Sequence, residues 1–283
     1  MHRSLKMNHF PPQISPTVLT IAGSDPTGGA GIQADLKTMT IIGVYGAAAI
    51  TCITVQNSLG VSESVPLDPD LVVRQVKAVL ADHKVTHIKI GMIGTIEIAA
   101  ALGSLLDDFQ GEVICDPVLT STTGQPLLSG DRLTELHSHL ISKVTVLTPN
   151  TDELARLCQQ KPATPEEAVQ CATLLLARHR HLRAVIVKGG HLEQGSAVIH
   201  DYLLARNREV VTSKRPRINS VNLHGTGCTY ASAFAAYHCL GQDYNTAFLR
   251  TATFMDQLIR KSSTANFIQS GNNGPLFHAQ QRP

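Results

Sequence analysis

The sequence predicts an α/β protein in which helices cover both faces of a mostly parallel sheet. Three observations support this class. Short apolar runs alternate with amphipathic segments, the pattern of strand–helix–strand crossovers. Of the 283 residues, 43% are hydrophobic and 16% are charged, so the chain can bury a sizeable core. Only 4% are aromatic and none is Trp, which is typical of helices packed closely on a sheet through small side chains.

The elements of the first third can be justified in order. Thr17–Ala22 is a short apolar run that ends at a glycine, as a buried strand does. Gly31–Ile42 has apolar side chains at helical spacing and stops at Gly43. Ala47–Val55 is rich in Ile, Thr and Val, which favours a strand. The run Asp68–Asp70 then supplies an N-cap and a proline at the first turn of a helix.

Strands and helices continue to alternate through the rest of the chain. Further strands are expected at His87–Ile90, Glu112–Cys115, Val144–Leu147 and Ala184–Val187. Helices are expected at Glu97–Phe109, Asp131–Ile141, Asp152–Gln159, Glu166–Arg178, Thr229–Leu240 and Tyr244–Ile259. The runs Ala197–Leu204 and Glu209–Ser213 flank Asn207, which predicts a hairpin at a sheet edge.

The chain is expected to be one domain, because no Pro/Gly/Ser-rich linker divides residues 17–283. Residues 1–16 are mostly polar and lack the apolar stretch of a signal peptide, so they are interpreted as a loose N-terminal extension. The net charge of +2 gives no reason to expect nucleic acid as a partner. No apolar run reaches the roughly 18 residues that span a bilayer. Six cysteines without CxxC spacing indicate reduced thiols and a cytoplasmic protein.

Two glycine-rich segments stand where ligands bind in such sheets, beyond the carboxyl ends of the strands. Gly23–Gly31 (GSDPTGGAG) lets the backbone approach a ligand closely, although a flexible turn is the alternative. His224–Cys228 (HGTGC) leads into a helix and predicts an anion site at the helix start. Cys228 would lie in the first turn, where the pKa of its thiol is expected to fall. The alternative there is a glycine N-cap with a structural cysteine.

Polar residues stand in three segments that follow expected strands. Asp116 ends a strand and offers a carboxylate for Mg²⁺, or else forms an Asp-Pro turn. Asn150 and Glu153 form a capping-box pattern, or place a carboxylate near a metal and phosphate. Lys188 precedes two glycines and suits either a phosphate or a surface turn. Together with the glycine-rich segments, these groups are what phosphoryl transfer needs.

The motifs also carry a family resemblance, which runs from Thr17 to His278. They are IAGSDPTGGAGIQADLKT, QNSLGV, KIGM, TPNTDE, VKGGH and HGTGC. They resemble the hydroxymethylpyrimidine/phosphomethylpyrimidine kinases of the ribokinase-like superfamily. The HGTGC form, with Cys where sugar kinases carry Asp, is specific for the pyrimidine and pyridoxal kinase branch. Leu119–Gly124 departs from the usual MVAKSG-like run, and Leu223 stands where Thr is common.

The resemblance implies a three-layer ribokinase-like fold, ATP and Mg²⁺ as cofactors, and a homodimer. The implied reaction phosphorylates 4-amino-5-hydroxymethyl-2-methylpyrimidine and then its monophosphate, in thiamine biosynthesis. The resemblance also implies that Cys228 is the catalytic base and that Gly225, Thr226 and Gly227 form the anion hole. It assigns substrate contacts to Gly23, Ala30, Asp35, Gln56, Met92 and Val118, nucleotide contacts to Asn150 and Lys188, and metal contacts to Asp116 and Glu153.

Two other functions stay open on the sequence. A pyridoxal kinase would act on a similar flat heteroaromatic alcohol. A non-catalytic nucleotide or pyrimidine sensor could use the same fold, although the intact HGTGC and the paired carboxylates favour an enzyme. Asp35 is expected one turn into the first helix and facing the cleft, where its carboxylate would accept a hydrogen bond from the ring amine.

Overall fold

The computed structural model describes residues 16–118, 135, 139–192, 195–267 and 273–279. Residues 1–15 of the expected N-terminal extension lie outside this part of the chain. So do the run 119–124 and most of the helix expected over Asp131–Ile141.

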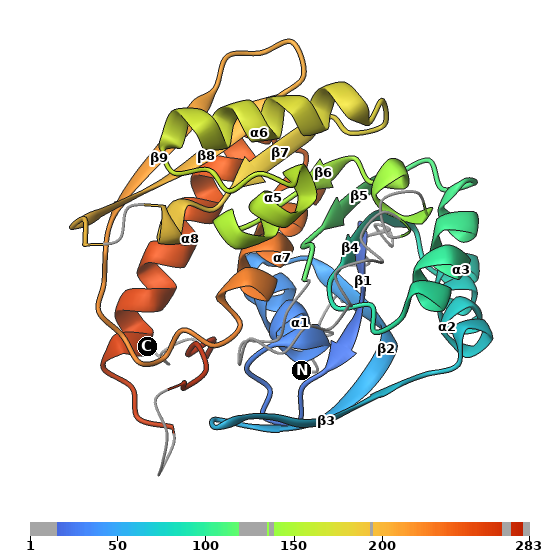
Figure 1. Ribbon diagram of the computed structural model, residues 1–283. Helices are drawn as coiled ribbons and strands as arrows, with labels where there is room; N and C mark the ends of the chain where they lie inside the picture. Colours follow the sequence, from blue (N-terminus) through green and yellow to red (C-terminus); the bar gives the residue numbers. More distant parts are fainter. Residues whose placement is uncertain (1–15, 119–134, 136–138, 193–194, 268–272, 280–283) are drawn as a thin grey trace, which may run out of the picture.

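The described strands form one nine-stranded sheet in the order β3-β2-β1-β4-β5-β6-β7-β8-β9 (Figure 1). From β2 through β7 each neighbouring pair is parallel, whereas β3, β8 and β9 pair antiparallel at the two edges. The centre of the sheet is therefore parallel, as expected. The strands are β1 (Thr17–Ser24), β2 (Tyr45–Asn57), β3 (Gly60–Pro66), β4 (Val85–Ile90), β5 (Glu112–Cys115), β6 (Val146–Leu147), β7 (Ala184–Val187), β8 (Val198–Ala205) and β9 (Val211–Pro216).

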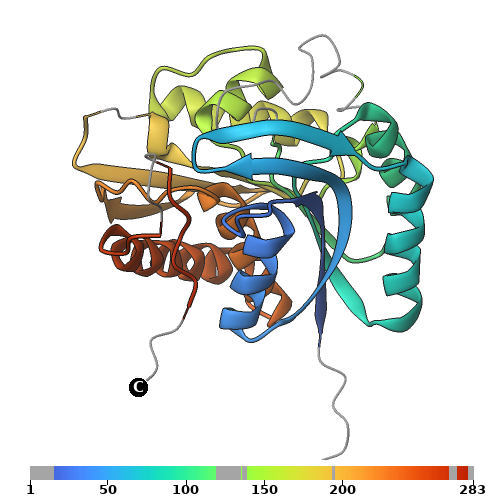
Figure 2. The same cartoon turned by 90° about the horizontal axis from the view of Figure 1, so that it is seen from below.

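Helices cover both faces of this sheet, which makes three layers. Figure 2 shows α5 and α6 on one side of β8 and β9, and α8 on the other. The α-helices are α1 (Gly31–Ile42), α2 (Pro69–Asp82), α3 (Ile96–Leu106), α5 (Thr151–Cys158), α6 (Pro165–Arg178), α7 (Thr226–Cys239) and α8 (Tyr244–Ser263). The described residues also form two short 3₁₀ turns, η2 (Ile141–Lys143) and η3 (Gly189–His191).

The strand sequences explain the layers, because alternate side chains of one strand enter different cores. Leu19 and Ile21 of β1 pack in the core under α2, α3, α5 and α6. Val18 packs in the core under α1, α7 and α8. In β5 the residue Ile114 faces that second core, whereas its neighbours face the first. Strands buried on both faces are apolar throughout, which is why they are visible in the sequence.

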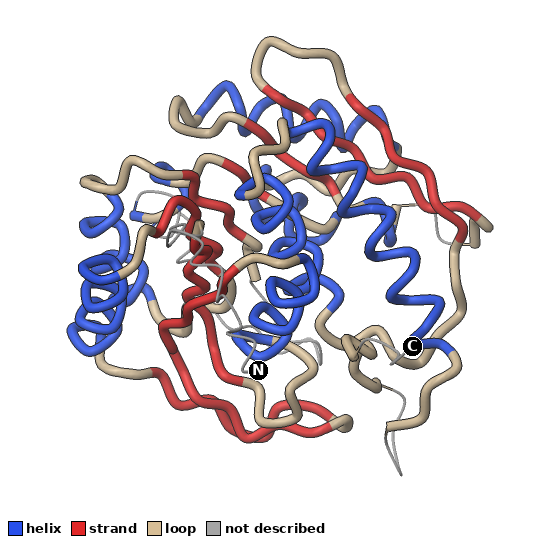
Figure 3. The backbone as a smooth tube through the Cα atoms, turned by 180° about the vertical axis from the view of Figure 1, so that it is seen from behind, coloured by secondary structure: helices blue, strands red, loops and turns tan. Residues whose placement is uncertain are grey.

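Most expected elements are present, with ends that differ by a few residues. The edge hairpin is β8–β9, and Asn207 in its turn has a φ of 57°, in the left-handed region. The strand β3 was not expected. It forms a hairpin with β2 at the other edge of the sheet (Figure 3). Its sequence GVSESVP is largely exposed, so it lacks the apolar pattern of a buried strand.

The parallel strands all end at one edge of the sheet, where α1, α5 and α7 begin. The loop after β1 leads into α1, and the residues that follow β5, β6 and β7 are Asp116, Thr148 and Lys188. Lys188 pairs with Asn150 in an isolated parallel bridge, which brings the polar residues of two strands together. No helix in the described residues is long and apolar enough to cross a membrane.

Candidate active site

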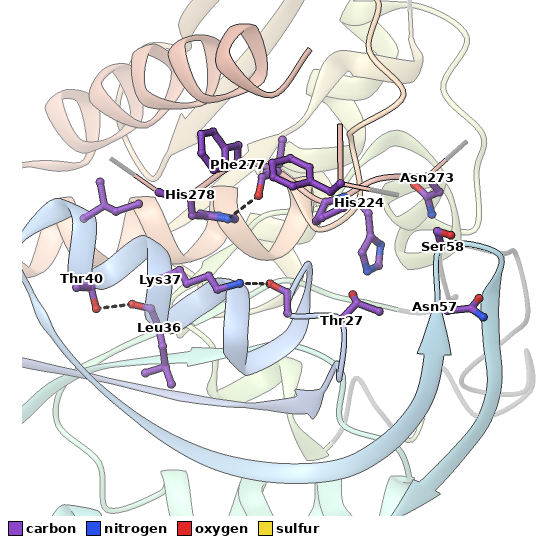
Figure 4. Close-up of a pocket in the computed structure, with 16 residues that line it drawn as sticks. Thr27, Leu36, Lys37, Thr40, Asn57, Ser58, His224, Asn273, Phe277 and His278 are labelled. Atoms are coloured by element: carbon purple, nitrogen blue, oxygen red, sulfur yellow. Dashed lines mark hydrogen bonds between the residues drawn. The ribbon is translucent and has the colours of Figure 1, made fainter. Parts of the chain in front are cut away.

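Two cavities share His224 as a common wall residue. The larger, about 730 Å³, lies between α1 and the C-terminal segment and is drawn in Figure 4. None of the predicted site residues lines it. The smaller, about 520 Å³, lies beyond the carboxyl ends of the parallel strands and is lined by every predicted site residue except Asp35. We therefore place the candidate active site in the smaller cavity, because the titratable and polar side chains predicted for catalysis line it.

The glycine-rich loop after β1 is folded around the carboxylate of Asp25. That carboxylate accepts hydrogen bonds from the backbone N–H groups of Thr27, Gly29 and Ala30 and from the Thr27 hydroxyl. Gly31 has a φ of 57°, and a Cβ there would lie 2.3 Å from the carbonyl oxygen of Gly23. The loop is thus an ordered turn that only glycine permits at this position, not the flexible turn of the alternative interpretation.

The start of α7 offers free backbone donors to the cavity. Gly225 is its N-cap, with a φ of 83° and no side-chain cap. The N–H of Thr226 donates to the carbonyl of Leu223, whereas within the described chain no acceptor is found for those of Gly227 and Cys228. The start of α7 therefore leaves the N–H groups of Gly227 and Cys228 available to the cavity, whereas that of Thr226, which was expected to contribute, is already bonded. The anion site itself stays a prediction.

The thiol of Cys228 lines the same cavity. Burial raises its pKa to about 11, against the opposing effect of the Lys89 ammonium. The expectation that the pKa of this thiol falls is wrong. Burial raises the pKa, because a thiolate loses its hydration there, and this effect is larger than the lowering by the Lys89 ammonium.

Asp116, Lys188 and Glu153 meet at one point of the cavity wall. Lys188 Nζ lies 2.7 Å from Asp116 Oδ1 and 3.7 Å from Glu153 Oε2. Burial acts to lower the pKa of Lys188, but the two carboxylates outweigh it and raise that pKa. The lysine is therefore a fixed positive charge. A Cβ placed on Gly227 would lie 3.1 Å from Asp116 Oδ2, so the helix start abuts this group.

Glu153 and Asn150 form the capping box of α5. Asn150 Oδ1 accepts from the N–H of Glu153 at 2.9 Å, and Glu153 Oε2 accepts from the N–H of Asn150 at 2.7 Å. Both residues also line the cavity, so the capping interpretation and the site interpretation hold together. Burial raises the pKa of Glu153 to about 7, opposed by Lys188.

Metal binding has two carboxylates available at this point. The described residues contain no cluster of three or more His, Cys, Asp and Glu side chains that would hold a metal by themselves. Asp116 and Glu153 nevertheless suit Mg²⁺, which is commonly held by one or two carboxylates together with substrate phosphates.

The walls expected around a flat ring line the cavity beside these groups. Gly23, Ala30, Met92 and Val118 contribute small or apolar surface, and Gln56 contributes a carboxamide. A Cβ on Gly23 would lie 2.8 Å from Cys52 Sγ, so a larger residue there would not fit without a shift.

Asp35 is the exception among the predicted residues, and its expected place is wrong. It is fully buried beneath the cavity and does not line it. Its oxygens lie 2.8 and 2.9 Å from Lys89 Nζ and accept from the hydroxyls of Thr20 and Ser232. The helix face that carries Asp35 points into the sheet, so the carboxylate forms its ion pair and hydrogen bonds within the core.

Two site residues were missed by the sequence interpretation. Asp25 and His224 both line the cavity, and His224 Nε2 lies 2.9 Å from Asp25 Oδ2. Both residues belong to the glycine-rich segments, whose glycines were the basis of the site prediction. A titratable side chain within a loop that approaches a ligand closely is the sequence feature that indicates them.

The amino-acid sequence is similar to those of known kinases. The sequence profile of the phosphomethylpyrimidine kinase family matches residues 25–275. The chain is 36% identical over 263 residues to the hydroxymethylpyrimidine/phosphomethylpyrimidine kinase of Salmonella typhimurium, covering 92% of this chain and 96% of that protein.

Two solved structures extend the comparison to the fold. The pyridoxal kinase of Staphylococcus aureus in complex with AMP-PCP and pyridoxal superposes with a TM-score of 0.82, at 28% identity and with 93% of each chain covered. The phosphomethylpyrimidine kinase of Clostridium difficile superposes with a TM-score of 0.73, at 31% identity, covering 86% of this chain and 98% of that one.

Proposed function

Because the chain belongs to the phosphomethylpyrimidine kinase family and has its ribokinase-like fold, we propose that it is the thiamine-biosynthetic kinase of that family. It transfers the γ-phosphoryl group of ATP to the hydroxymethyl oxygen of 4-amino-5-hydroxymethyl-2-methylpyrimidine. It then phosphorylates the resulting monophosphate to the diphosphate. In each step an oxygen–phosphorus bond forms at the substrate, the bond from the γ-phosphorus to the bridging oxygen of ATP breaks, and ADP leaves.

One observation carries this proposal. The free N–H groups at the start of α7, the Lys188 ammonium and the Asp116 carboxylate converge on one wall of the 520 Å³ cavity. Phosphoryl transfer depends mainly on positioning and on charge stabilisation around the moving group. We assign the phosphates to this wall, with Asn150 and Lys188 on the nucleotide side, and the aminopyrimidine to the wall that contains Gln56.

Mg²⁺ completes the charge balance in this proposal. When bound, it would neutralise phosphate charge and help to align the nucleotide. Asp116 and Glu153 are the residues that would hold it. Lys188, which lies between the two carboxylates, keeps them in place before the nucleotide arrives.

Cys228 is the group proposed to take the proton of the alcohol. Its thiol must first ionise, and burial opposes that ionisation whereas the Lys89 ammonium favours it. The monophosphate step needs no such base, because a phosphate oxygen is already ionised at neutral pH. The two steps therefore make different demands on the same residue.

Product analysis tests the assignment. The purified protein is incubated with ATP, Mg²⁺ and either the aminopyrimidine alcohol or pyridoxal, and the products are separated by chromatography. We expect the monophosphate and then the diphosphate of the pyrimidine, with pyridoxal turned over less efficiently. Higher kcat/KM on pyridoxal would favour the second candidate, which the likeness to the Staphylococcus aureus enzyme supports. Absence of ADP formation with either alcohol would favour a sensor.

A homodimer is also proposed, and the β2–β3 hairpin supports it. Ile53, Val55 and Val65 stand on the outer face of this hairpin with exposed fractions of 50%, 53% and 47%. Ile53 and Val65 are cross-strand partners, so the apolar side chains are contiguous. A second copy of the chain would bury this surface.

A further inference from the structure

His224 stands between the Asp25 carboxylate and the Gln56 carboxamide. Its Nε2 lies 2.9 Å from Asp25 Oδ2 and 2.8 Å from the terminal amide atom of Gln56 placed as Nε2. Figure 4 shows the ring above Thr27 of the glycine-rich loop, with Asn57 and Ser58 of the β2–β3 hairpin to its right. One ring nitrogen thus contacts two polar groups from different segments.

The protonation state of Asp25 decides what this nitrogen does. Burial acts to raise the pKa of Asp25, but the hydrogen bonds from His224, Thr27 and Ala30 lower it to about 2. The group is therefore a carboxylate, which can only accept hydrogen bonds. His224 Nε2 must carry the hydrogen and donate it.

The other ring nitrogen agrees with a neutral imidazole. His224 Nδ1 is buried and has no hydrogen-bond partner within the described residues. A doubly protonated ring would leave a charged N–H donor unpaired there, which costs more than an unpaired neutral acceptor. The tautomer with hydrogen on Nε2 alone satisfies both observations.

That tautomer constrains Gln56. A nitrogen that donates to Asp25 cannot also accept from an amide NH₂, and the oxygen and nitrogen of a carboxamide have nearly the same shape. The hydrogen on Nε2 is compatible only with Gln56 Oε1 turned toward His224. The amide NH₂ then points away from His224, into the cavity that Gln56 lines.

The hairpin backbone supports this role for Gln56. The β2–β3 register shifts between Val55 and Gln56 because the extra residue, Ser62, is on β3, so β2 keeps its regular alternation of side chains up to Gln56. Thr54, two residues earlier on the same face, donates its hydroxyl hydrogen to the Ser24 carbonyl and ties β2 to the glycine-rich loop. Gln56 is thus aimed at the cavity by its strand and oriented by His224.

We propose that Asp25 and His224 are positioning residues that fix the Gln56 carboxamide with its NH₂ toward the substrate. The site then selects a flat heteroaromatic ring with an unprotonated ring nitrogen, a hydrogen-bond acceptor, at that point. A ring N–H or an amine in the same place would meet a second donor and be rejected. This inference rests on the proposed function for the identity of the ring and not for the tautomer.

The first test is independent of catalysis. Long-range ¹H–¹⁵N NMR of the ¹⁵N-histidine-labelled protein reads the tautomer of each ring, and the His224 signals are assigned by their loss in His224→Gln. We expect the hydrogen on Nε2 and a bare Nδ1 in the wild-type protein. Hydrogen on Nδ1 would mean that Nε2 accepts from Gln56 and that Oε1 faces the cavity, which would overturn the proposal.

The second test uses substrate analogues with the wild-type protein and Gln56→Ala. Turnover of the parent aminopyrimidine alcohol by the wild type establishes the proposed function separately. Two analogues each replace one ring nitrogen by CH, and a third lacks the amine. Gln56→Ala should raise KM for the parent roughly 3- to 10-fold with kcat nearly unchanged, the loss of one neutral hydrogen bond. The same substitution should leave KM unchanged for the analogue that lacks the ring nitrogen facing the Gln56 NH₂, because that analogue has no hydrogen bond to lose. If only the amine-free analogue escaped the penalty, the amide would be oriented the other way.

The third test separates positioning from general structure. Asp25→Asn should raise KM by a similar factor, and the double variant with Gln56→Ala should be no worse than either single variant. Additive losses would show that Asp25 does not act through Gln56. The matched control is Asp82→Asn, which removes the carboxylate of the surface pair with His83 and should leave KM unchanged.

Discussion

At the scale of single residues, the buried state of Cys228 determines how the two phosphorylation steps respond to pH. The pKa of this thiol is raised to about 11, so the thiolate fraction is small at neutral pH and grows about tenfold per pH unit. If Cys228 takes the alcohol proton, kcat for the alcohol should rise with pH from 7 to 9. The rate on the monophosphate should lack this rise, because its nucleophile is already ionised. Separate rates on the two substrates provide the measurement.

Cys228→Ala is the control for that pH dependence. The variant should lose the slope on the alcohol and keep most of the rate on the monophosphate. Equal losses on both substrates, or the same slope in the variant, would remove the thiol as the base and leave the kinase assignment intact.

The carboxylates beside Lys188 give a second prediction at this scale. Asp116→Asn with Glu153→Gln should raise the Mg²⁺ concentration needed for half-maximal rate, because two oxygen ligands lose their charge. The side-chain amide oxygen that Glu153→Gln introduces can still accept from the Asn150 N–H and so keep the capping box. Activity titrated against Mg²⁺ at saturating ATP is the measurement. An unchanged Mg²⁺ dependence would leave Glu153 as a cap and Asp116 as a partner of Lys188 only.

At the scale of elements, the start of α7 is locked against the glycine-rich loop. Gly225 has a φ of 83°, and a Cβ on it would lie 1.9 Å from the carbonyl oxygen of Gly29. Gly225→Ala should therefore displace the loop, destabilise the protein by more than the roughly 1–2 kcal/mol of left-handed strain, and lower kcat/KM. Chemical denaturation and steady-state kinetics measure the two effects.

Gly241 provides a matched control for that substitution. It has the same φ of 83°, but a Cβ there would have no atom of the described residues within 4 Å. Gly241→Ala should show only the strain and keep the activity. If the two variants lost equal stability and both stayed active, the contact between α7 and the loop would be unimportant for the site.

At the scale of the whole molecule, Asp35 and Lys89 tie four elements together. Asp35 on α1 pairs with Lys89 on β4 and accepts from Thr20 on β1 and Ser232 on α7, all fully buried. Asp35→Asn leaves a buried ammonium without its counter-charge, which should cost about 3–5 kcal/mol of stability. Urea unfolding measures the loss, with Asp107→Asn in the exposed pair with Lys143 as a control expected to cost under about 1 kcal/mol.

The same variant distinguishes the core role of Asp35 from a substrate contact. Wild-type stability of Asp35→Asn combined with a large loss of kcat/KM on the pyrimidine would indicate that Asp35 contacts the substrate. A stability loss of the expected size, with kcat/KM kept in the folded fraction, would place it in the core.

The proposed homodimer makes a prediction for the assembled molecule. Val55→Arg puts a charge on the exposed apolar face of the β2–β3 hairpin and should convert dimer to monomer in sedimentation velocity. Val210→Arg, at another exposed position, is the control and should leave the sedimentation coefficient unchanged. A dimer that survives Val55→Arg would have its interface elsewhere.

The layered fold could be predicted from the sequence, and so could most of the residues that line the 520 Å³ cavity. Strands buried on both faces are continuous apolar runs, and helix ends carry local signals, such as the Asp68 cap of α2 that accepts from the N–H of Leu71. The exposed strand β3 has neither signal and was missed. Residues that follow parallel strands must meet at one sheet edge, which is why Asp116 and Lys188 could be grouped from the sequence alone.

Which groups each side chain contacts depends on the tertiary structure and could not be predicted from local sequence. The helical spacing that predicts α1 does not say whether Asp35 faces a cavity or the core. Asp35 lies in the core because its counter-charge, Lys89 of β4, is buried there. Likewise the pKa of Cys228 is raised mainly by burial and also by the carboxylates of Asp35 and Asp116, which come from other segments of the chain. The contact of His224 with Asp25, 199 residues away in the chain, exists only once both loops are placed. Local pattern fixes elements, whereas desolvation and partners from distant segments fix the state of a charge.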